Sequence, residues 1–228
     1  VGAALEVVLD ASPGNLDPEG HPVEVEALLA TWRAFAEQTR VPAETSFRLS
    51  VVTDGINTTN AFESTAPARW PSGTGALEAR RTFVEDVEGG LSSLVVEEVE
   101  QSAIIAGIWA AARRLQETDA STRWLVVLSD GRDLRRKGEG RTGWWFARDV
   151  PERDEVIAEL RETQELPALS GVRLWLCGVH ARPVLSQSWS PAQDARLRAA
   201  YRAIGHEAGA LSTRVLEHCS QSSRTRVE

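Results

Sequence analysis

The stretch RWLVVLSDG, residues 123–131, decides the fold class of this chain. Its first six residues are mostly apolar and of strand length, and they run directly into the turn signal SDG. The beginning of the chain repeats this design, because ALEVVL at 4–9 ends in Asp10. Continuous apolar runs of this kind are typical of strands that are buried on both faces, as in parallel sheets.

Strands and helices are expected to alternate along the rest of the chain. The sequence predicts further strands at 47–53, 58–63, 172–179 and 210–216, and helices at 25–39, 76–87, 103–116, 152–164 and 192–208. The strand at 58–63 can pair back on the preceding strand as a hairpin. We expect Gly89-Gly90 to close one helix and Ser102 to be the N-cap of another. This alternation predicts an α/β fold with a three-layer, Rossmann-like open sheet, mostly parallel, with helices on both faces.

Composition limits the classes of protein to consider. The chain has 228 residues, of which 42% are hydrophobic and 25% charged, so it can form a buried core. No apolar run approaches the ~18–20 residues of a membrane span. The net charge of −8 disfavours nucleic-acid binding, which needs a basic surface. We expect one domain over residues 1–219, with a loop insertion at 132–150 and a disordered tail at 220–228.

The apolar residues and the two cysteines suggest which side chains fill the core. Four tryptophans occupy apolar periodic positions and are predicted to be buried: Trp32, Trp109, Trp124 and Trp175. Cys177 is interpreted as a small core residue. A bridge between Cys177 and Cys219 stays open, because spacing alone cannot decide it.

Polar side chains gather at one predicted edge of the sheet. Asp10 and Ser12 follow the first strand, Asp130 follows the strand at 123–128, and Ser102 begins a helix. Ligands bind beyond the carboxyl ends of the strands in such sheets. The short segments concerned hold no basic residue, and their oxygen atoms suit Mg²⁺, Ca²⁺ or Mn²⁺. Taken singly, each residue is equally explained as a turn or a helix cap.

These segments, in this order, resemble the von Willebrand factor A (vWA) domain family. The resemblance is carried by DASPG at 10–14, QSAIIAGI at 101–108 and LVVLSDGRD at 125–133. It implies a six-stranded sheet with one antiparallel edge strand and a metal-ion-dependent adhesion site. In that site Asp10 and Ser12 would contact the metal, Ser102 would contact it through its hydroxyl, and Asp130 would act directly or through water.

One position departs from the family pattern. Gly14 stands where the family usually has a second serine, so one hydroxyl ligand is missing. Asn15 or water could substitute for it. The departure leaves open a metal-free member of the fold.

The resemblance implies a non-enzymatic module that binds a partner protein through a divalent cation, the partner supplying an Asp or Glu carboxylate. A metal-free structural or assembly subunit and a metal-assisted phosphohydrolase are the alternatives, although the sequence contains none of the common hydrolase or nucleotide-binding motifs. Trp144, Trp145 and Phe146 in the insertion are candidate partner-binding residues, unless the loop folds back and buries them. We expect a periplasmic or cell-surface location, with a cytoplasmic one as the alternative.

Overall fold

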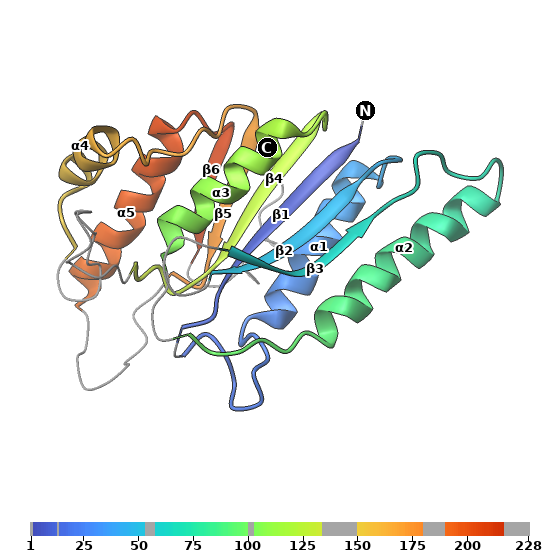
Figure 1. Cartoon of the computed structure of the whole chain (residues 1–228), viewed down its shortest axis with the longest axis horizontal. Helices are drawn as coiled ribbons and strands as arrows, with labels where there is room; N and C mark the ends of the chain where they lie inside the picture. The colour runs from blue at the N-terminus through green and yellow to red at the C-terminus, as the bar shows by residue number, and fades with distance from the viewer. Residues whose placement is uncertain are drawn as a thin grey trace.

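A computed structural model describes residues 2–12, 14–52, 58–99, 103–133, 150–179 and 190–216 (Figure 1). The elements are β1 (Ala3–Asp10), α1 (Val25–Thr39), β2 (Ser46–Val52), β3 (Thr58–Thr65), α2 (Gly75–Ser92), α3 (Ile104–Glu117), β4 (Thr122–Leu128), α4 (Arg153–Glu162), β5 (Val172–Cys177), α5 (Pro191–Glu207) and β6 (Ser212–Leu216). Most of the expected insertion and all of the expected tail lie outside the described residues. None of the described helices has the length and apolar character needed to cross a membrane.

The six strands form one sheet in the order β3-β2-β1-β4-β5-β6. Every neighbouring pair is parallel except β2 and β3, which are antiparallel. The predicted mostly parallel sheet with one antiparallel edge strand is therefore confirmed. β1 lies between β2 and β4, so β1 and β4 end side by side at the same edge of the sheet (Figure 1).

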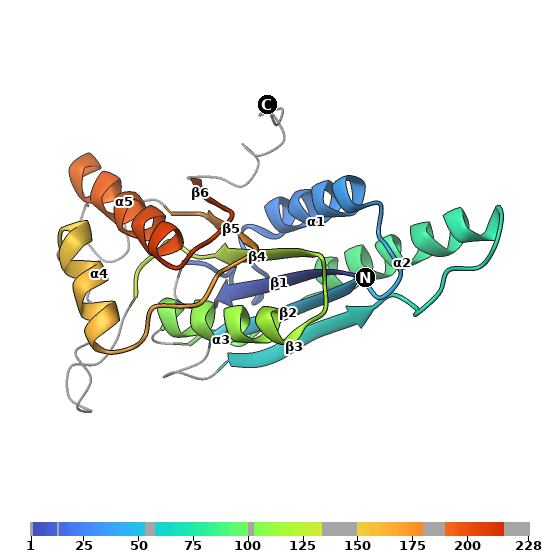
Figure 2. The same ribbon diagram turned by 90° about the horizontal axis from the view of Figure 1, so that it is seen from above.

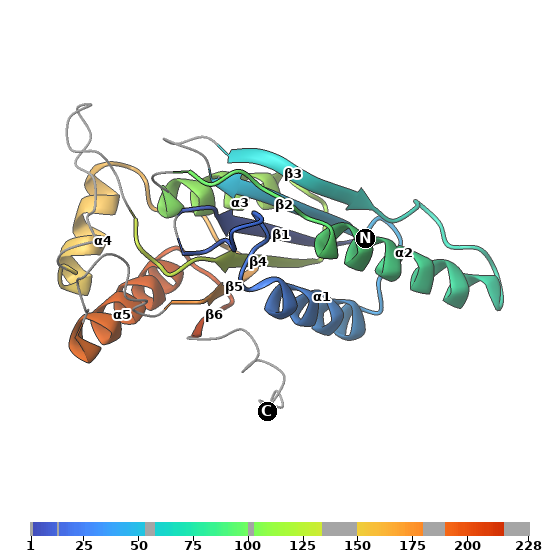
Figure 3. The ribbon, with the colours of Figure 1, turned by 90° about the horizontal axis from the view of Figure 1, so that it is seen from below.

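Helices cover both faces of the sheet (Figures 2 and 3). One apolar cluster joins α1 and α2 to the sheet, and a second joins α3, α4 and α5 to its other face. Aromatic rings fill the first cluster: Trp32 lies 5.3 Å from Phe47, and Phe35 lies 5.3 Å from Trp124, measured between ring centroids. The sequence predicted these buried tryptophans from their apolar periodic positions.

Trp109 does not belong to the core. It was predicted to be buried, but 41% of its surface is exposed. Ile104, Ile108 and Leu115 recur at helical spacing along the buried stripe of α3, and Trp109 lies beyond the edge of that stripe. The Arg113 guanidinium, one turn further along, lies 6.0 Å from the centroid of its ring. The prediction was wrong because one helix has room for only one sheet-facing stripe.

Two helix ends also differ from the prediction. α2 continues through Gly89-Gly90 to Ser92, because Gly90 packs directly against the ring of Phe62 on β3, where a side chain would not fit. Tertiary packing thus overrides the weak helix propensity of glycine. At the start of α3 the N-cap position is Ala103, one residue after the predicted Ser102, and no side chain caps the helix there. Gly107 donates its N–H to the Ala103 carbonyl, which fixes the first turn.

An ion pair between Glu6 of β1 and Arg114 of α3 lies between the sheet and this helix. Glu6 interrupts the apolar run of β1 and is buried, and Arg114 of α3 donates to its Oε2 from Nη2 at 2.8 Å and from Nε at 3.0 Å. Arg114 also donates to the Ser50 hydroxyl on β2. Burial raises the pKa of Glu6, and the Arg114 guanidinium opposes that rise.

Candidate functional site at the carboxyl edge of the sheet

Asp10 is the last residue of β1, and it is completely buried. Its Oδ1 accepts the backbone N–H of Ser12 at 2.9 Å, and its Oδ2 accepts the hydroxyl of Ser129 at 2.6 Å. Ser129 follows β4, the neighbouring strand, so this hydrogen bond joins the ends of the two strands. The Ser129 hydroxyl in turn accepts the N–H of Gly131 at 2.9 Å. Asp10 is therefore held in one orientation by neutral donors from both loops.

Ser12 lies beside Asp10 and is also buried. Its hydroxyl accepts a hydrogen bond from the Asn15 side-chain amide at 3.2 Å, and its carbonyl accepts the Asn15 backbone N–H at 3.1 Å. Gly14 between them has a φ of 92°, a conformation that side chains rarely adopt. The backbone conformation therefore explains why glycine stands where the vWA pattern has serine. The Asn15 side chain lies beside the Ser12 hydroxyl instead.

Asp130 follows Ser129 and is buried as well. Both of its carboxylate oxygens face Arg132: Oδ1 accepts the Arg132 backbone N–H at 2.9 Å, and Oδ2 lies 3.5 Å from Arg132 Nε. Gly131, with a φ of 85°, allows the chain to turn between them. Tyr201 of α5 donates its hydroxyl to the Gly131 carbonyl at 3.0 Å, which fastens this turn to α5.

Three of the four predicted metal ligands thus lie in adjoining loops at one edge of the sheet: Asp10, Ser12 and Asp130. The fourth, Ser102, lies outside the described residues, as do Trp144, Trp145 and Phe146. Sequence reasoning did not assign a role to Ser129 or Arg132, nor to Asp133, whose side chain is fully buried in the same loop. Ser129 could have been found, because it directly precedes Asp130 in the turn signal.

No protein-family model and no curated protein matches the sequence. Among solved structures, the D319A mutant of the PilB minor pilin from Streptococcus sanguinis is similar, with 15% identity and a TM-score of 0.56 over 97% of this chain and 59% of the pilin. An aerotolerance-related membrane protein from Bacteroides fragilis has 13% identity and a TM-score of 0.49, over 98% of this chain and 96% of that one. A von Willebrand factor type A protein from Catenulispora acidiphila has 12% identity and a TM-score of 0.45, and the match covers 96% of this chain and 40% of that protein.

The six-stranded, mostly parallel sheet, its antiparallel edge strand and the polar loops after β1 and β4 are the features that the vWA resemblance predicts. This chain has a vWA-like fold. At this level of identity the pilin comparison shows the fold alone. This chain aligns with about three fifths of the pilin, so the rest of the pilin has no counterpart in the alignment.

The oxygen atoms of this site are of the kind that a hard cation such as Mg²⁺ or Ca²⁺ prefers as ligands. The two carboxylates and the Ser12 hydroxyl offer oxygen atoms, and Mg²⁺ takes only one or two carboxylates from a protein. Each carboxylate oxygen has two lone pairs, so one hydrogen bond to it does not by itself exclude a cation. Within the described parts of the chain, no three His, Cys, Asp or Glu side chains form a group that could hold a metal. Any cation would therefore depend on hydroxyls and water as well.

Cys177 ends β5 at the same edge of the sheet. It is fully buried, as predicted for a core residue, and it forms a disulfide bond. The sequence contains one other cysteine, Cys219, which lies outside the described residues.

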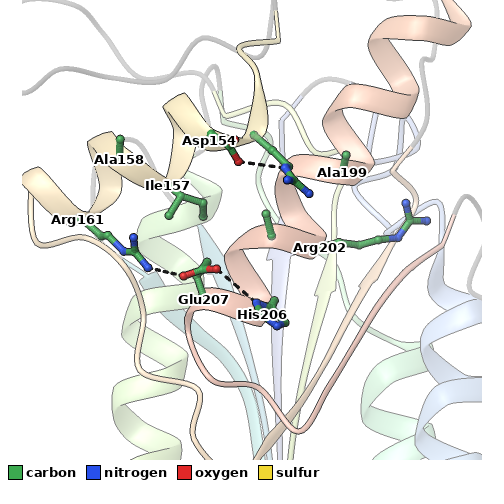
Figure 4. Close-up of a pocket in the computed structure, with 10 residues that line it drawn as sticks. Asp154, Ile157, Ala158, Arg161, Ala199, Arg202, His206 and Glu207 are labelled. Atoms are coloured by element: carbon green, nitrogen blue, oxygen red, sulfur yellow. Dashed lines mark hydrogen bonds and ion pairs between the residues drawn. The ribbon is translucent and has the colours of Figure 1, made fainter.

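A separate hollow of about 670 Å³ lies between α4 and α5 (Figure 4). An ion pair from Arg161 of α4 to Glu207 of α5 crosses it, and Arg153 and Asp154 pair with each other at the start of α4. Arg202 also lines the hollow. None of the residues that sequence analysis selected lines it, so it is distinct from the site at the edge of the sheet.

Proposed function

We propose that this vWA-like domain is a non-enzymatic protein-binding module that holds a divalent cation at the carboxyl edge of its sheet and engages an acidic group of a partner protein. One observation carries the proposal: Asp10 and Ser12 at the end of β1, and Asp130 far along the sequence after β4, are all buried at the same edge of the sheet, where Ser129 donates to Asp10. Burying carboxylates costs free energy unless charge or hydrogen bonds compensate them, so their gathering supports a function.

Asp10, Ser12 and Asp130 would hold the cation, with Ser102 as the expected fourth ligand. Bound Mg²⁺, Ca²⁺ or Mn²⁺ would supply a coordination position for a carboxylate oxygen of the partner. The chain's own contribution is orientation. Ser129 fixes the Asp10 carboxylate from the neighbouring strand, and Asn15 fixes the Ser12 hydroxyl.

The surface around the cation would determine the partner. Trp144, Trp145 and Phe146 remain the residues that we expect to contact it, because aromatic side chains are frequent among the residues that dominate binding energy. We further propose an extracytoplasmic location. The disulfide at Cys177 supports it, since disulfides persist mainly in oxidising compartments.

A second candidate function is that of a metal-free assembly subunit with the same fold. Two observations favour it: the Arg132 side chain faces the Asp130 carboxylate, and Gly14 supplies no hydroxyl. In this case the edge of the sheet would be stabilised by internal contacts, and binding to a partner would not need a cation.

Calorimetric titration of Mg²⁺, Ca²⁺ and Mn²⁺ into EDTA-treated protein tests the proposal. We expect saturable binding in the wild type and in an Asp86→Asn control on the exposed face of α2, and none in Asp10→Ala. Thermal unfolding with and without Mg²⁺ gives an independent measurement, because a ligand that binds only the folded state raises its stability. Absence of binding by the wild type would refute the proposal and favour the metal-free subunit.

Hydrolysis of a model phosphodiester, measured in the same buffers, tests the alternative that the protein is an enzyme. Metal-dependent turnover that Asp10→Ala abolishes would contradict the non-enzymatic assignment and favour a phosphohydrolase. We expect no turnover.

A further inference from the structure

The two carboxylates of the site are held in different ways. The oxygens of Asp10 accept hydrogen bonds from neutral donors, the Ser12 N–H and the Ser129 hydroxyl. Both oxygens of Asp130 contact Arg132, which adds a positive charge at 3.5 Å from Oδ2. Asp130 therefore has a fixed cation from its own loop at its carboxylate.

The Arg132 side chain is well placed to keep this position. It is only 13% exposed, and the Asp130 side chain is 6% exposed, so water screens their attraction weakly. The turn that connects them is also fixed. Val179, Leu197 and Tyr201 pack closely around Gly131, within 3.0 to 3.3 Å of where a Cβ would lie.

We propose that Arg132 acts as a tethered cation that competes with the divalent metal for Asp130 and so lowers the metal affinity of the site. A metal that uses Asp130 must share this carboxylate with the guanidinium or displace it, and two cations near one carboxylate repel each other. Without metal, the guanidinium keeps the buried Asp130 charge balanced. The inference rests on the proposed function, because it concerns the same cation site.

The site would consequently exist in two forms, one closed by Arg132 and one loaded with metal. Both forms place a cation at Asp130, so the loop after β4 is stabilised in either state. Arg132 then decides the metal concentration at which the module becomes competent to bind an acidic partner.

The test compares Mg²⁺ affinity, by calorimetry, in the wild type, Arg132→Gln and Arg132→Lys. Glutamine keeps the backbone N–H on Asp130 but removes the charge, so we expect Mg²⁺ to bind on the order of tenfold more tightly. Lysine restores the charge, and its affinity should return toward that of the wild type. Arg113→Gln, on the exposed surface of α3, is the control and should leave the affinity unchanged.

Thermal unfolding supplies a second readout that does not depend on a partner. In EDTA, Arg132→Gln should melt at a lower temperature than the wild type, because Asp130 loses the positive charge that Arg132 supplies. Saturating Mg²⁺ should then raise its melting temperature by more than it raises that of the wild type.

A wild-type measurement keeps the inference testable if Arg132→Gln does not fold. The Nε–H signal of Arg132, followed by nitrogen-15 NMR, should shift as Mg²⁺ is added, because the guanidinium leaves Asp130. A signal that stays unchanged at saturating Mg²⁺ would overturn the inference.

The outcomes separate this inference from the proposed function. Tighter binding by Arg132→Gln supports both. Equal affinity in the wild type and Arg132→Gln overturns the competition and leaves the cation site standing. Absence of Mg²⁺ binding in all variants overturns the proposed cation site and the competition with it.

Discussion

Replacing Arg114 by methionine should destabilise the domain, because it leaves the Glu6 carboxylate buried without its cation. Arg114 donates twice to Glu6 Oε2, at 2.8 and 3.0 Å, and once to the Ser50 hydroxyl at 3.1 Å. Methionine keeps an apolar stem of similar length, so the change removes the charge and the donors while preserving most of the packing.

The exposure of the two side chains sets the magnitude. The Glu6 side chain is 9% exposed and that of Arg114 is 24% exposed. Removing one partner of a buried ion pair costs about 3–5 kcal/mol. Because water reaches part of Arg114, we expect a loss somewhat below that range, about 2–3 kcal/mol in the free energy of unfolding.

The loss of unfolding free energy in Arg114→Met should depend on pH, and the direction of this dependence follows from the raised pKa of Glu6. A carboxyl whose folded-state pKa lies above its unfolded value favours folding when it is protonated, and this contribution disappears as the pH rises through the folded pKa. Removal of the Arg114 charge raises that pKa further. The difference in stability between the wild type and Arg114→Met should therefore shrink as the pH is lowered from about 7 to about 5.

Urea unfolding at several pH values measures this, and Arg113→Met is a matched control one residue away. Arg113 pairs with Glu117 at 3.2 Å, but the two side chains are 67% and 64% exposed, so the control should lose at most about 0.5 kcal/mol. Adding Glu6→Gln to Arg114→Met should recover much of the loss. Equal losses in the two arginine variants, or a loss that does not change with pH, would refute the reasoning.

Three further substitutions test the turn after β4 and the course of α2, and all are measured by chemical unfolding. Tyr201→Phe removes the buried hydrogen bond to the Gly131 carbonyl and should cost about 1–2 kcal/mol; a change within experimental error would mean that α5 does not fasten the turn. Gly89→Ala, with open space around it, should stabilise by about 0.5–1 kcal/mol, whereas Gly90→Ala should destabilise by its overlap with Phe62. Stabilisation by both alanines would show that α2 does not pack there as described.

Local sequence patterns predicted the positions of strands and helices well because each element has its own hydrophobic period. The run ALEVVL at 4–9 and the sheet-facing stripe of α3 are visible without any knowledge of their neighbours. The placement of Asp10 and Asp130 at one edge also follows from sequence, since parallel strands that alternate with helices must end on the same side. The limits lay at Gly90, which depends on Phe62 from another element, and at Trp109, whose apolar character does not say on which side of the helix it lies.

The sequence by itself thus determined the α/β fold with its alternating strands and helices. It also suggested the hairpin of β2 and β3, and it nominated Asp10, Ser12, Ser102 and Asp130 as candidate ligands. Only the tertiary structure decided that Glu6 is compensated by Arg114 from α3, that Ser129 orients Asp10, and that Arg132 turns back onto Asp130. The physical reason is that hydrophobic periodicity is a local property of the chain. Charge compensation and hydrogen bonding, in contrast, depend on distances of a few ångströms between loops and elements that only folding brings together.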